Sequence, residues 1–313
     1  MDTIVQKIKE LKARRSAIIL AHNYQMPEVQ EIADFCGDSL ELARIAAGSR
    51  AKVIVYCGVD FMAETASILC PEATVVMADR TATCPMANML SAAQLRELKA
   101  KHPRAAVIGY VNSSAEVKAE LDACCTSSNA VAVVKAYQTS PEIIFGPDKY
   151  LADYVSRTTG RALITWDGFC PTHMKILPDD IVVQKKLHPK AKVLVHPECL
   201  PEVVAMADAV LSTSGMAAYA KKTHAVEMII GTEIGMVYRL AQDFPQKRFF
   251  PAAARAVCQN MKKGSVKKVL AALETLRPEV RISEDIRVRA ARAIDRMRSE
   301  EHTSELQSHS GIS

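Results

Sequence analysis

Three cysteines at nearly regular spacing are the residues of this sequence best suited to bind a metal. Cys84, Cys170 and Cys258 are separated by about 86 and about 88 residues, as one ligand from each of three similar repeats would be. Thiolates bind iron-sulfur clusters and zinc. Three thiolates would leave one iron of a [4Fe-4S] cubane open, so that it could bind and polarise a substrate as a Lewis acid.

Two other roles for cysteine stay open. Zinc could be bound by the same three cysteines, with His173, three residues after Cys170, as a fourth ligand. Inert buried thiols are the other alternative, because free cysteine is among the most buried residue types. We expect that structural role for the remaining cysteines, which are Cys36, Cys57, Cys70, Cys124, Cys125 and Cys199. No CxxC pair occurs, which excludes a zinc ribbon and a thioredoxin motif.

Polar residues follow several short apolar runs of strand length, where α/β proteins usually place their chemistry. These residues are His22, Asn23, Tyr24, Tyr110, Asn112, His196 and Glu198. Tyr24 and Glu198 are candidates for proton transfer, and His22 and His196 for binding substrate oxygens. A histidine in such a place can equally be a structural residue with satisfied hydrogen bonds.

Three turns rich in Gly, Ser and Thr lead directly into helical patterns. Their sequences are GDSLELA at residues 37–43, TSSNAVA at 126–132 and STSGMAA at 212–218. Backbone N–H groups, hydroxyls and the helix dipole suit such turns to phosphate or carboxylate. Each turn alone could be an ordinary N-cap, but three together indicate a substrate with several anionic groups.

Short apolar runs alternate with helical patterns along the whole chain, which predicts an α/β fold with parallel sheets. Three stretches share four landmarks in one order: a polar strand end, a hydroxyl-rich turn, a glycine (Gly58, Gly146 or Gly231) and a terminal cysteine. We therefore expect three pseudo-threefold-related repeats at 1–86, 87–173 and 174–260. Any α/β protein alternates strands with helices, so a chance alignment is the alternative, which the shared order disfavours.

Composition and charge set the class of protein. The 313 residues are 49% hydrophobic and 24% charged, as in a globular protein, and the net charge of +5 is spread thinly. The charge favours anionic metabolites over nucleic acid, and no apolar run is long enough to span a membrane. No GxGxxG follows the first strand and no GxxxxGK[ST] occurs, which argues against dinucleotide and P-loop sites.

The two ends of the sequence indicate where in the cell the protein is found and whether the last residues are native. The start, MDTIVQKIKELKARR, has the pattern of an amphipathic helix rather than a signal peptide. We therefore expect a cytoplasmic protein, and a monomer because no obligate interface is evident. The stretch RSEEHTSELQS near the C-terminus resembles a translated sequencing adapter, so we interpret residues 298–313 as a non-native tail.

The chain resembles the quinolinate synthase (quinolinate synthetase A) family of de novo NAD biosynthesis, from its first helix to about Met297. The motifs that carry the resemblance are AHNYQ, GDSLELA, TCPMANM, GYVNSSAEVKA, CTSSNAV, FGPDKYLA, GFCPTHM, VHPEC, STSGM, GTEIG and CQNMKK. The resemblance implies condensation of iminoaspartate with dihydroxyacetone phosphate to quinolinate, with loss of phosphate and water. It also implies an oxygen-sensitive [4Fe-4S] cluster on Cys84, Cys170 and Cys258.

The resemblance implies a fold and roles for individual residues. The fold is three α/β/α three-layer domains with parallel sheets around a central active site, and C-terminal helices at 261–297 that pack back on the first domain. Catalytic roles fall on Tyr24, Glu198 and His22. Substrate-binding roles fall on His22, Ser39, Tyr110, Asn112, Ser127, His173, His196, Glu198, Ser212 and Thr213. Ser128 stays an alternative to Ser127. L-aspartate oxidase or aspartate dehydrogenase is implied as the source of iminoaspartate.

Two other functions use the same features. An iron-sulfur hydro-lyase acting on a hydroxy acid would need the same three thiolates and open iron. A redox or iron sensor that carries a cluster would need a partner-binding surface, but not His22, Tyr24, His196 and Glu198 together. The presence of all four at strand ends disfavours the sensor.

The ligand set predicts the result of a metal analysis. After anaerobic purification, the wild-type protein should contain iron and sulfide, and changing Cys84, Cys170 or Cys258 to Ser should each disrupt the cluster. Iron and sulfide counts measure this directly. A cluster that stays intact after any one of the three changes would show that the ligand set is wrong.

Overall fold

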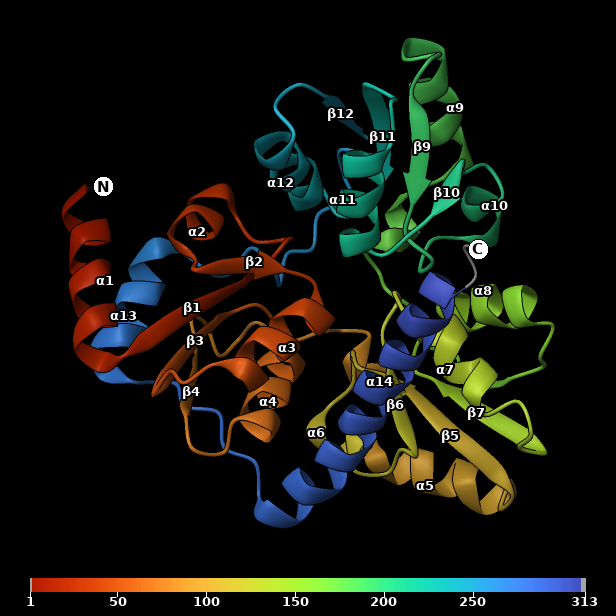
Figure 1. The fold of residues 1–313 in the computed structure, drawn as a ribbon, viewed down its shortest axis with the longest axis horizontal. Helices are drawn as coiled ribbons and strands as arrows, with labels where there is room; N and C mark the ends of the chain where they lie inside the picture. The colour runs from red at the N-terminus through yellow and green to blue at the C-terminus, as the bar shows by residue number, and fades with distance from the viewer. Residues whose placement is uncertain (1, 311–313) are drawn as a thin grey trace. The chain divides into compact units, whose positions relative to one another are not determined.

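The computed structural model describes residues 2–310, with the side chains of residues 3–297. Two compact units make up the chain (Figure 1). The first comprises Met1–Cys84 with Pro171–Ile282, and the second comprises Pro85–Cys170 with Ser283–Ser313. Residues 311–313, and the side chains from residue 298 onward, lie outside the described part. The non-native origin of 298–313 therefore stays a prediction.

The first unit contains two parallel sheets. In the first sheet the strands are β1 (Ala17–His22), β2 (Phe35–Gly37), β3 (Val53–Cys57) and β4 (Thr74–Met77), in the order β2-β1-β3-β4. The helices around it are α1 (Asp2–Arg15), α2 (Pro27–Ile32), α3 (Ser39–Gly48), α4 (Asp60–Leu69) and α13 (Val266–Thr275). Every residue of β3 is buried, which is typical of a parallel strand covered on both faces.

The second sheet of this unit has the same design. Its strands are β9 (Lys192–Val195), β10 (Ala209–Val210), β11 (Glu227–Gly231) and β12 (Arg248–Pro251), in the order β10-β9-β11-β12. Its helices are the short η2 (His173–Lys175), α9 (Pro178–Leu187), α10 (Pro201–Val204), α11 (Thr213–Lys222) and α12 (Gly235–Asp243). Val193 and Ile229 pack on the side of α9 and α10, and Leu194 and Ile230 on the side of α11 and α12.

The second unit is built on one sheet. Its strands are β5 (Ala105–Tyr110), β6 (Ala123–Cys125), β7 (Glu142–Gly146) and β8 (Ile164–Thr165), in the order β6-β5-β7-β8. Its helices are η1 (Ala87–Met89), α5 (Ala92–Lys101), α6 (Ala115–Lys118), α7 (Ala130–Ala136), α8 (Lys149–Thr159) and α14 (Glu284–Ser310). The α/β fold class is therefore confirmed: there are three parallel sheets, and each lies between layers of helices. Their arrangement around a common centre stays a prediction.

One hydrogen bond recurs in every sheet and supports the repeat. An aspartate just before the second strand accepts the N–H of the first strand, 15 residues earlier in each case. Asp34 accepts from Ile19 at 2.7 Å, Asp122 from Val107 at 2.8 Å, and Asp208 from Val193 at 2.8 Å. Each sheet lies within one of the three expected ranges, although the boundaries themselves remain a prediction.

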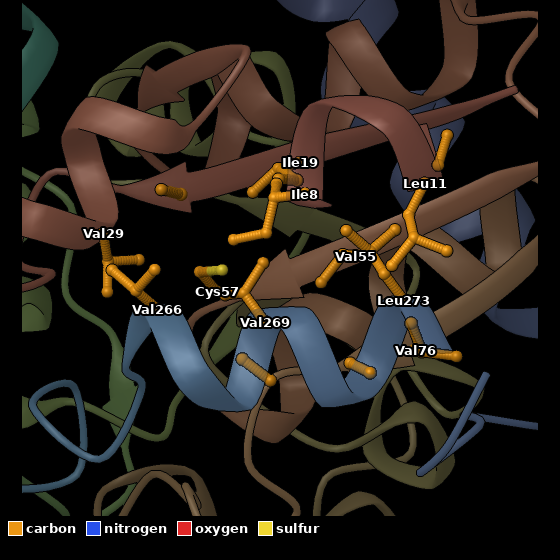
Figure 2. Close-up of a cluster of buried hydrophobic side chains, with 14 of the residues drawn as sticks. Ile8, Leu11, Ile19, Val29, Val55, Cys57, Val76, Val266, Val269 and Leu273 are labelled. Carbon is orange, nitrogen blue, oxygen red and sulfur yellow. The ribbon is translucent and has the colours of Figure 1, made fainter. Parts of the chain in front are cut away.

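The core of the first sheet shows how the C-terminal segment contributes to it. Ile8 and Leu11 of α1 and Val269 and Leu273 of α13 pack against the face of the sheet that carries Ile19 and Val55 (Figure 2). Burying such aliphatic side chains contributes about 1.5–3 kcal/mol each. Helix α13 therefore packs on the first repeat.

Helix α14 differs from the sequence-based expectation. We expected it to pack on the first repeat as well, but it packs against β6, α6 and α7 of the second unit. Its buried residues Ala290, Ala293, Ile294 and Met297 form an apolar stripe at helical spacing that must be covered. On the first sheet the corresponding face is already covered by α1 and α13. Within the described part of the chain, no helix is both long and apolar enough to cross a membrane.

Candidate functional site

Polar side chains gather at the carboxyl ends of the strands in the first unit. His22 is the last residue of β1, and His196 directly follows β9. The N–H of His196 donates to the carbonyl of Gly231, the last residue of β11, at 3.0 Å. Because all strands of each sheet are parallel, their carboxyl ends lie along one edge, where α/β proteins bind ligands.

A chain of close polar contacts joins the two candidate proton-transfer residues. The hydroxyls of Tyr24 and Thr232 are hydrogen-bonded at 2.6 Å, and the Thr232 hydroxyl is 2.9 Å from Nε2 of His173. Nδ1 of His173 lies 2.9 Å from Oε2 of Glu198, a contact between charged groups when the ring is protonated. The Tyr24 phenol is therefore linked through the Thr232 hydroxyl to the ring of His173, and the Glu198 carboxylate lies beside that ring at a contact that lacks hydrogen-bond geometry.

His22 and His196 are held in the neutral form. Burial lowers the pKa of His22 to about 3, and the nearby charges of Lys262 and His196 act in the same direction. Burial also lowers the pKa of His196 to about 3, although Glu198 opposes the shift. Since the energetic cost of burial falls on the charged form, both rings are uncharged near neutral pH.

The same two histidines share one tautomer. Nδ1 of His22 accepts the N–H of Tyr24 at 3.1 Å, and Nδ1 of His196 accepts the N–H of Glu198 at 3.3 Å. A neutral imidazole that accepts at Nδ1 carries its proton on Nε2. Each ring therefore presents an Nε2–H donor. The ring of His196 also stacks on that of His173, with centroids 4.7 Å apart.

The turns before α3 and α11 are linked to each other. Asp38 caps α3 by accepting the N–H groups of Leu40 and Glu41, both at 2.9 Å, and its other oxygen accepts the Ser214 hydroxyl at 2.6 Å. Ser212 caps α11 through the N–H of Gly215 at 3.1 Å. The Asp38 carboxylate thus lies at the N-terminus of α3 and also contacts the first turn of α11.

Thr213 and Ser39 complete these turns. Asn23, directly after β1, donates from its side-chain amide to the Thr213 hydroxyl at 3.2 Å. Ser39 is the first residue of α3. Both turns therefore have the N-cap role that each could have alone, and an anion-binding role for Ser39, Ser212 and Thr213 stays a prediction.

The cysteines fall into groups with different chemistry. Cys84, Cys170 and Cys258 are half-buried, as are Cys36 and Cys70, whereas Cys57, Cys124, Cys125 and Cys199 are fully buried. Burial raises the pKa of Cys124 to about 12 and raises those of Cys57 and Cys125 as well, which disfavours the thiolate needed for metal binding. The backbone N–H groups of Cys84 and Cys258 are each held by a carboxylate, those of Asp60 and Glu233, at 3.1 Å. The donor type and partial exposure of the three predicted ligands fit an iron-sulfur cluster.

The second unit carries the remaining candidates. Tyr110 ends β5 and is buried. Oδ1 of Asn112 is buried and has no hydrogen-bond partner among the described residues, which is a costly state for a polar atom unless a ligand satisfies it. The hydroxyls of Ser128 and Thr126 are hydrogen-bonded to each other at 3.0 Å. Ser127 precedes α7 in the same turn, and its role stays a prediction.

Sequence reasoning missed Thr232, which connects Tyr24 to His173. It directly follows β11, the third strand of its repeat, in the motif GTEIG. The interpretation of strand ends covered only the first strand of each repeat. Parallel pairing of β11 with β9 places the residues after both strands at one edge, so the glycine that ends β11 was the available signal.

The fold and these contacts define a class of protein: an α/β enzyme with a half-buried Tyr beside buried His and Glu residues at the strand ends. The family model described as "Quinolinate synthetase A protein" matches residues 6–299. The chain belongs to this family, as its sequence motifs predicted.

Curated relatives agree with the family match. The quinolinate synthase of Dehalococcoides mccartyi (strain CBDB1) is 54% identical over 296 residues, which cover 95% of this chain and 98% of the relative. The enzyme of Methanoregula boonei is 52% identical over 292 residues, covering 93% and 96%. That of Geotalea uraniireducens is 51% identical over 296 residues, covering 95% and 97%.

The two buried histidines predict an acid-sensitive fold. In the unfolded chain His22 and His196 have the ordinary pKa of about 6.5, so they bind protons below that pH. In the native protein the two rings stay neutral until the pH approaches about 3. The unfolded state then binds more protons, so the free energy of unfolding decreases as the pH falls. Between about pH 7 and pH 5 the loss should be about 1–2 kcal/mol per histidine.

Urea unfolding of the wild type and of a His22→Asn/His196→Asn variant at pH 7 and pH 5 measures this loss in the free energy of unfolding. The variant keeps an acceptor at each position and should lose less stability over the same range. The exposed His224 provides the control, and His224→Asn should follow the wild type. An equal loss of unfolding free energy in the double variant and the wild type would contradict the conclusion that His22 and His196 are held neutral.

Proposed function

We propose that this protein is a quinolinate synthase of de novo NAD biosynthesis, condensing iminoaspartate with dihydroxyacetone phosphate with loss of phosphate and water. The observation that carries the proposal is the contact chain from Tyr24 through Thr232 and His173 to Glu198, in a chain of the quinolinate synthetase A family. This series of contacts places an acid and a base at its two ends, as a condensation followed by dehydration requires.

Each residue of the site has a role that follows from its contacts. Glu198 takes a proton from the carbon next to the imine, so that this carbon becomes nucleophilic, and His173 beside it orients the carboxylate. Tyr24 moves protons between the carbons and oxygens of the intermediates. His22 and His196 donate from Nε2 to substrate oxygens without adding charge.

The substrates carry carboxylates and a phosphate, which need several anion-binding groups. In the first unit these are Ser212 and Thr213 at the start of α11, with Ser39 in the linked turn. Tyr110, Asn112 and Ser127 of the second unit complete the proposed set. The unsatisfied oxygen of Asn112 supports its share in binding.

Cys84, Cys170 and Cys258 would hold a [4Fe-4S] cluster, and membership of the quinolinate synthetase A family supports this set over the other half-buried cysteines, Cys36 and Cys70. When bound, the cluster supplies a Lewis-acidic iron that assists loss of water. We also propose a cytoplasmic monomer that obtains iminoaspartate from L-aspartate oxidase or aspartate dehydrogenase. The family match leaves the hydro-lyase and the redox sensor without support.

A single hydroxyl tests the proposal. The purified anaerobic protein should form quinolinate from iminoaspartate and dihydroxyacetone phosphate, and Tyr24→Phe should lower the rate by about 100-fold or more, because general acid-base groups contribute this much. Chromatographic detection of quinolinate measures both rates.

Tyr238 gives a matched control. Its hydroxyl donates to Glu31 on the surface, so Tyr238→Phe should keep the wild-type rate. A wild-type protein that makes no quinolinate would remove the proposed function. Undiminished quinolinate formation by Tyr24→Phe would remove only this tyrosine from the mechanism.

A further inference from the structure

Two acidic residues hold the backbones of two predicted cluster ligands in the first unit. Asp60 lies two residues after Gly58, which follows the third strand of the first repeat. Glu233 lies two residues after Gly231, which ends the third strand of the third repeat. Oδ1 of Asp60 accepts the N–H of Cys84, 24 residues later, and Oε1 of Glu233 accepts the N–H of Cys258, 25 residues later. The same contact therefore recurs at nearly the same sequence separation.

A second contact fixes each cysteine segment from the other side. The N–H of Asp60 donates to the carbonyl of Ala82 at 2.9 Å, and that of Ile234 donates to the carbonyl of Ala256 at 3.0 Å. Ala82 and Ala256 each lie two residues before the cysteine. Together the two contacts make a small bridge between the strand-end loop and the cysteine loop.

The second unit has part of the same bridge. The N–H of Lys149 donates to the carbonyl of Gly168 at 2.8 Å, and Gly168 again lies two residues before a cysteine, Cys170. Asp148 occupies the acidic position there, and its Oδ1 accepts the N–H groups of Tyr150 and Leu151. The backbone part of the bridge is thus common to all three repeats.

Glu233 also connects the cysteine loop to the catalytic tyrosine. Its side chain is 0% exposed, and it accepts the N–H of Gly235 at 2.7 Å and the ammonium of Lys262 at 3.0 Å. Lys262 in turn donates to the backbone carbonyl of Tyr24. A buried carboxylate is stable only when it is paired in this way, so one ion pair ties Cys258 and Tyr24 together.

We infer that Asp60 and Glu233 are positioning residues that hold Cys84 and Cys258, respectively, in place for the cluster. The inference rests on the proposed function, in which these cysteines are ligands. A hydrogen bond from a backbone N–H to a carboxylate is stronger than one between neutral groups. It therefore fixes the loop that carries each thiol before any metal binds.

Alkylation of the cluster-free protein tests the inference without using activity. Asp60→Ala should raise the rate at which iodoacetamide modifies Cys84 by about tenfold while leaving Cys258 unchanged, because loss of one charged hydrogen bond lets the loop open more often. Glu233→Ala should do the reverse. Peptide mass spectrometry measures both cysteines in the same sample, so each serves as the other's control.

Conservative variants separate positioning from general damage. Oδ1 of Asp60 accepts both the Phe61 and the Cys84 N–H groups, so Asp60→Asn keeps that acceptor and should restore the wild-type rate. Glu227 lies at the other end of β11, and Glu227→Gln should change neither cysteine. If Glu233→Ala fails to fold with Lys262 unpaired, Glu233→Ala/Lys262→Met removes both charges and should give the same selective effect.

The outcomes distinguish this inference from the proposed function. In anaerobically reconstituted protein, Asp60→Ala and Glu233→Ala should also lose iron to a chelator about tenfold faster than the wild type. A wild type that binds no cluster would overturn the proposed cofactor, while selective alkylation would still support the bridges. Alkylation at the wild-type rate at both cysteines in both variants would overturn the inference, whatever the cluster does.

Discussion

The parallel pairing of strands that are buried on both faces is the constraint on which this structure depends. A strand such as β3, with every residue buried, offers no place for a polar side chain along its length. Polar groups therefore gather mainly at the strand ends, and parallel pairing brings the carboxyl ends of one sheet to one edge. His196 and Thr232 lie near each other because β9 and β11 pair in one sheet and stop immediately before these residues, while His22 ends β1 of the other sheet of the unit.

Placing polar groups at a buried edge also determines their charge. The same burial that lowers the pKa of His22 and His196 to about 3 makes them neutral donors rather than cations. A positive charge next to His22 is instead supplied by Lys262, which is paired with Glu233.

Much of the fold could be predicted from sequence because a repeat shows the same landmarks more than once. The order of strand end, turn, glycine and cysteine predicted three α/β repeats, and the strand order of each sheet confirms them. The position of α14 could not be predicted in this way. Its stripe of Ala290, Ala293 and Ile294 shows that a face is buried, but the sequence does not say against which sheet.

The candidate site was predictable to the extent that its residues follow first strands. Tyr24, His196 and Glu198 follow β1 and β9, so their chemistry and position were evident together. Thr232 and Glu233 were not predicted, because a threonine and a glutamate after a third strand have no distinctive pattern alone. Their roles depend on partners that are distant in sequence, with Tyr24 208 residues from Thr232.

The Thr232 hydroxyl connects Tyr24 to His173, which lies beside Glu198, and its role can be measured from the rate of quinolinate formation by Thr232 variants. Thr232→Ser keeps the hydroxyl and should retain most of the rate. Thr232→Val keeps the shape but removes the hydroxyl that contacts both Tyr24 and His173, so the rate should fall by about 100-fold. A Thr232→Val protein that forms quinolinate as fast as the wild type would contradict the account.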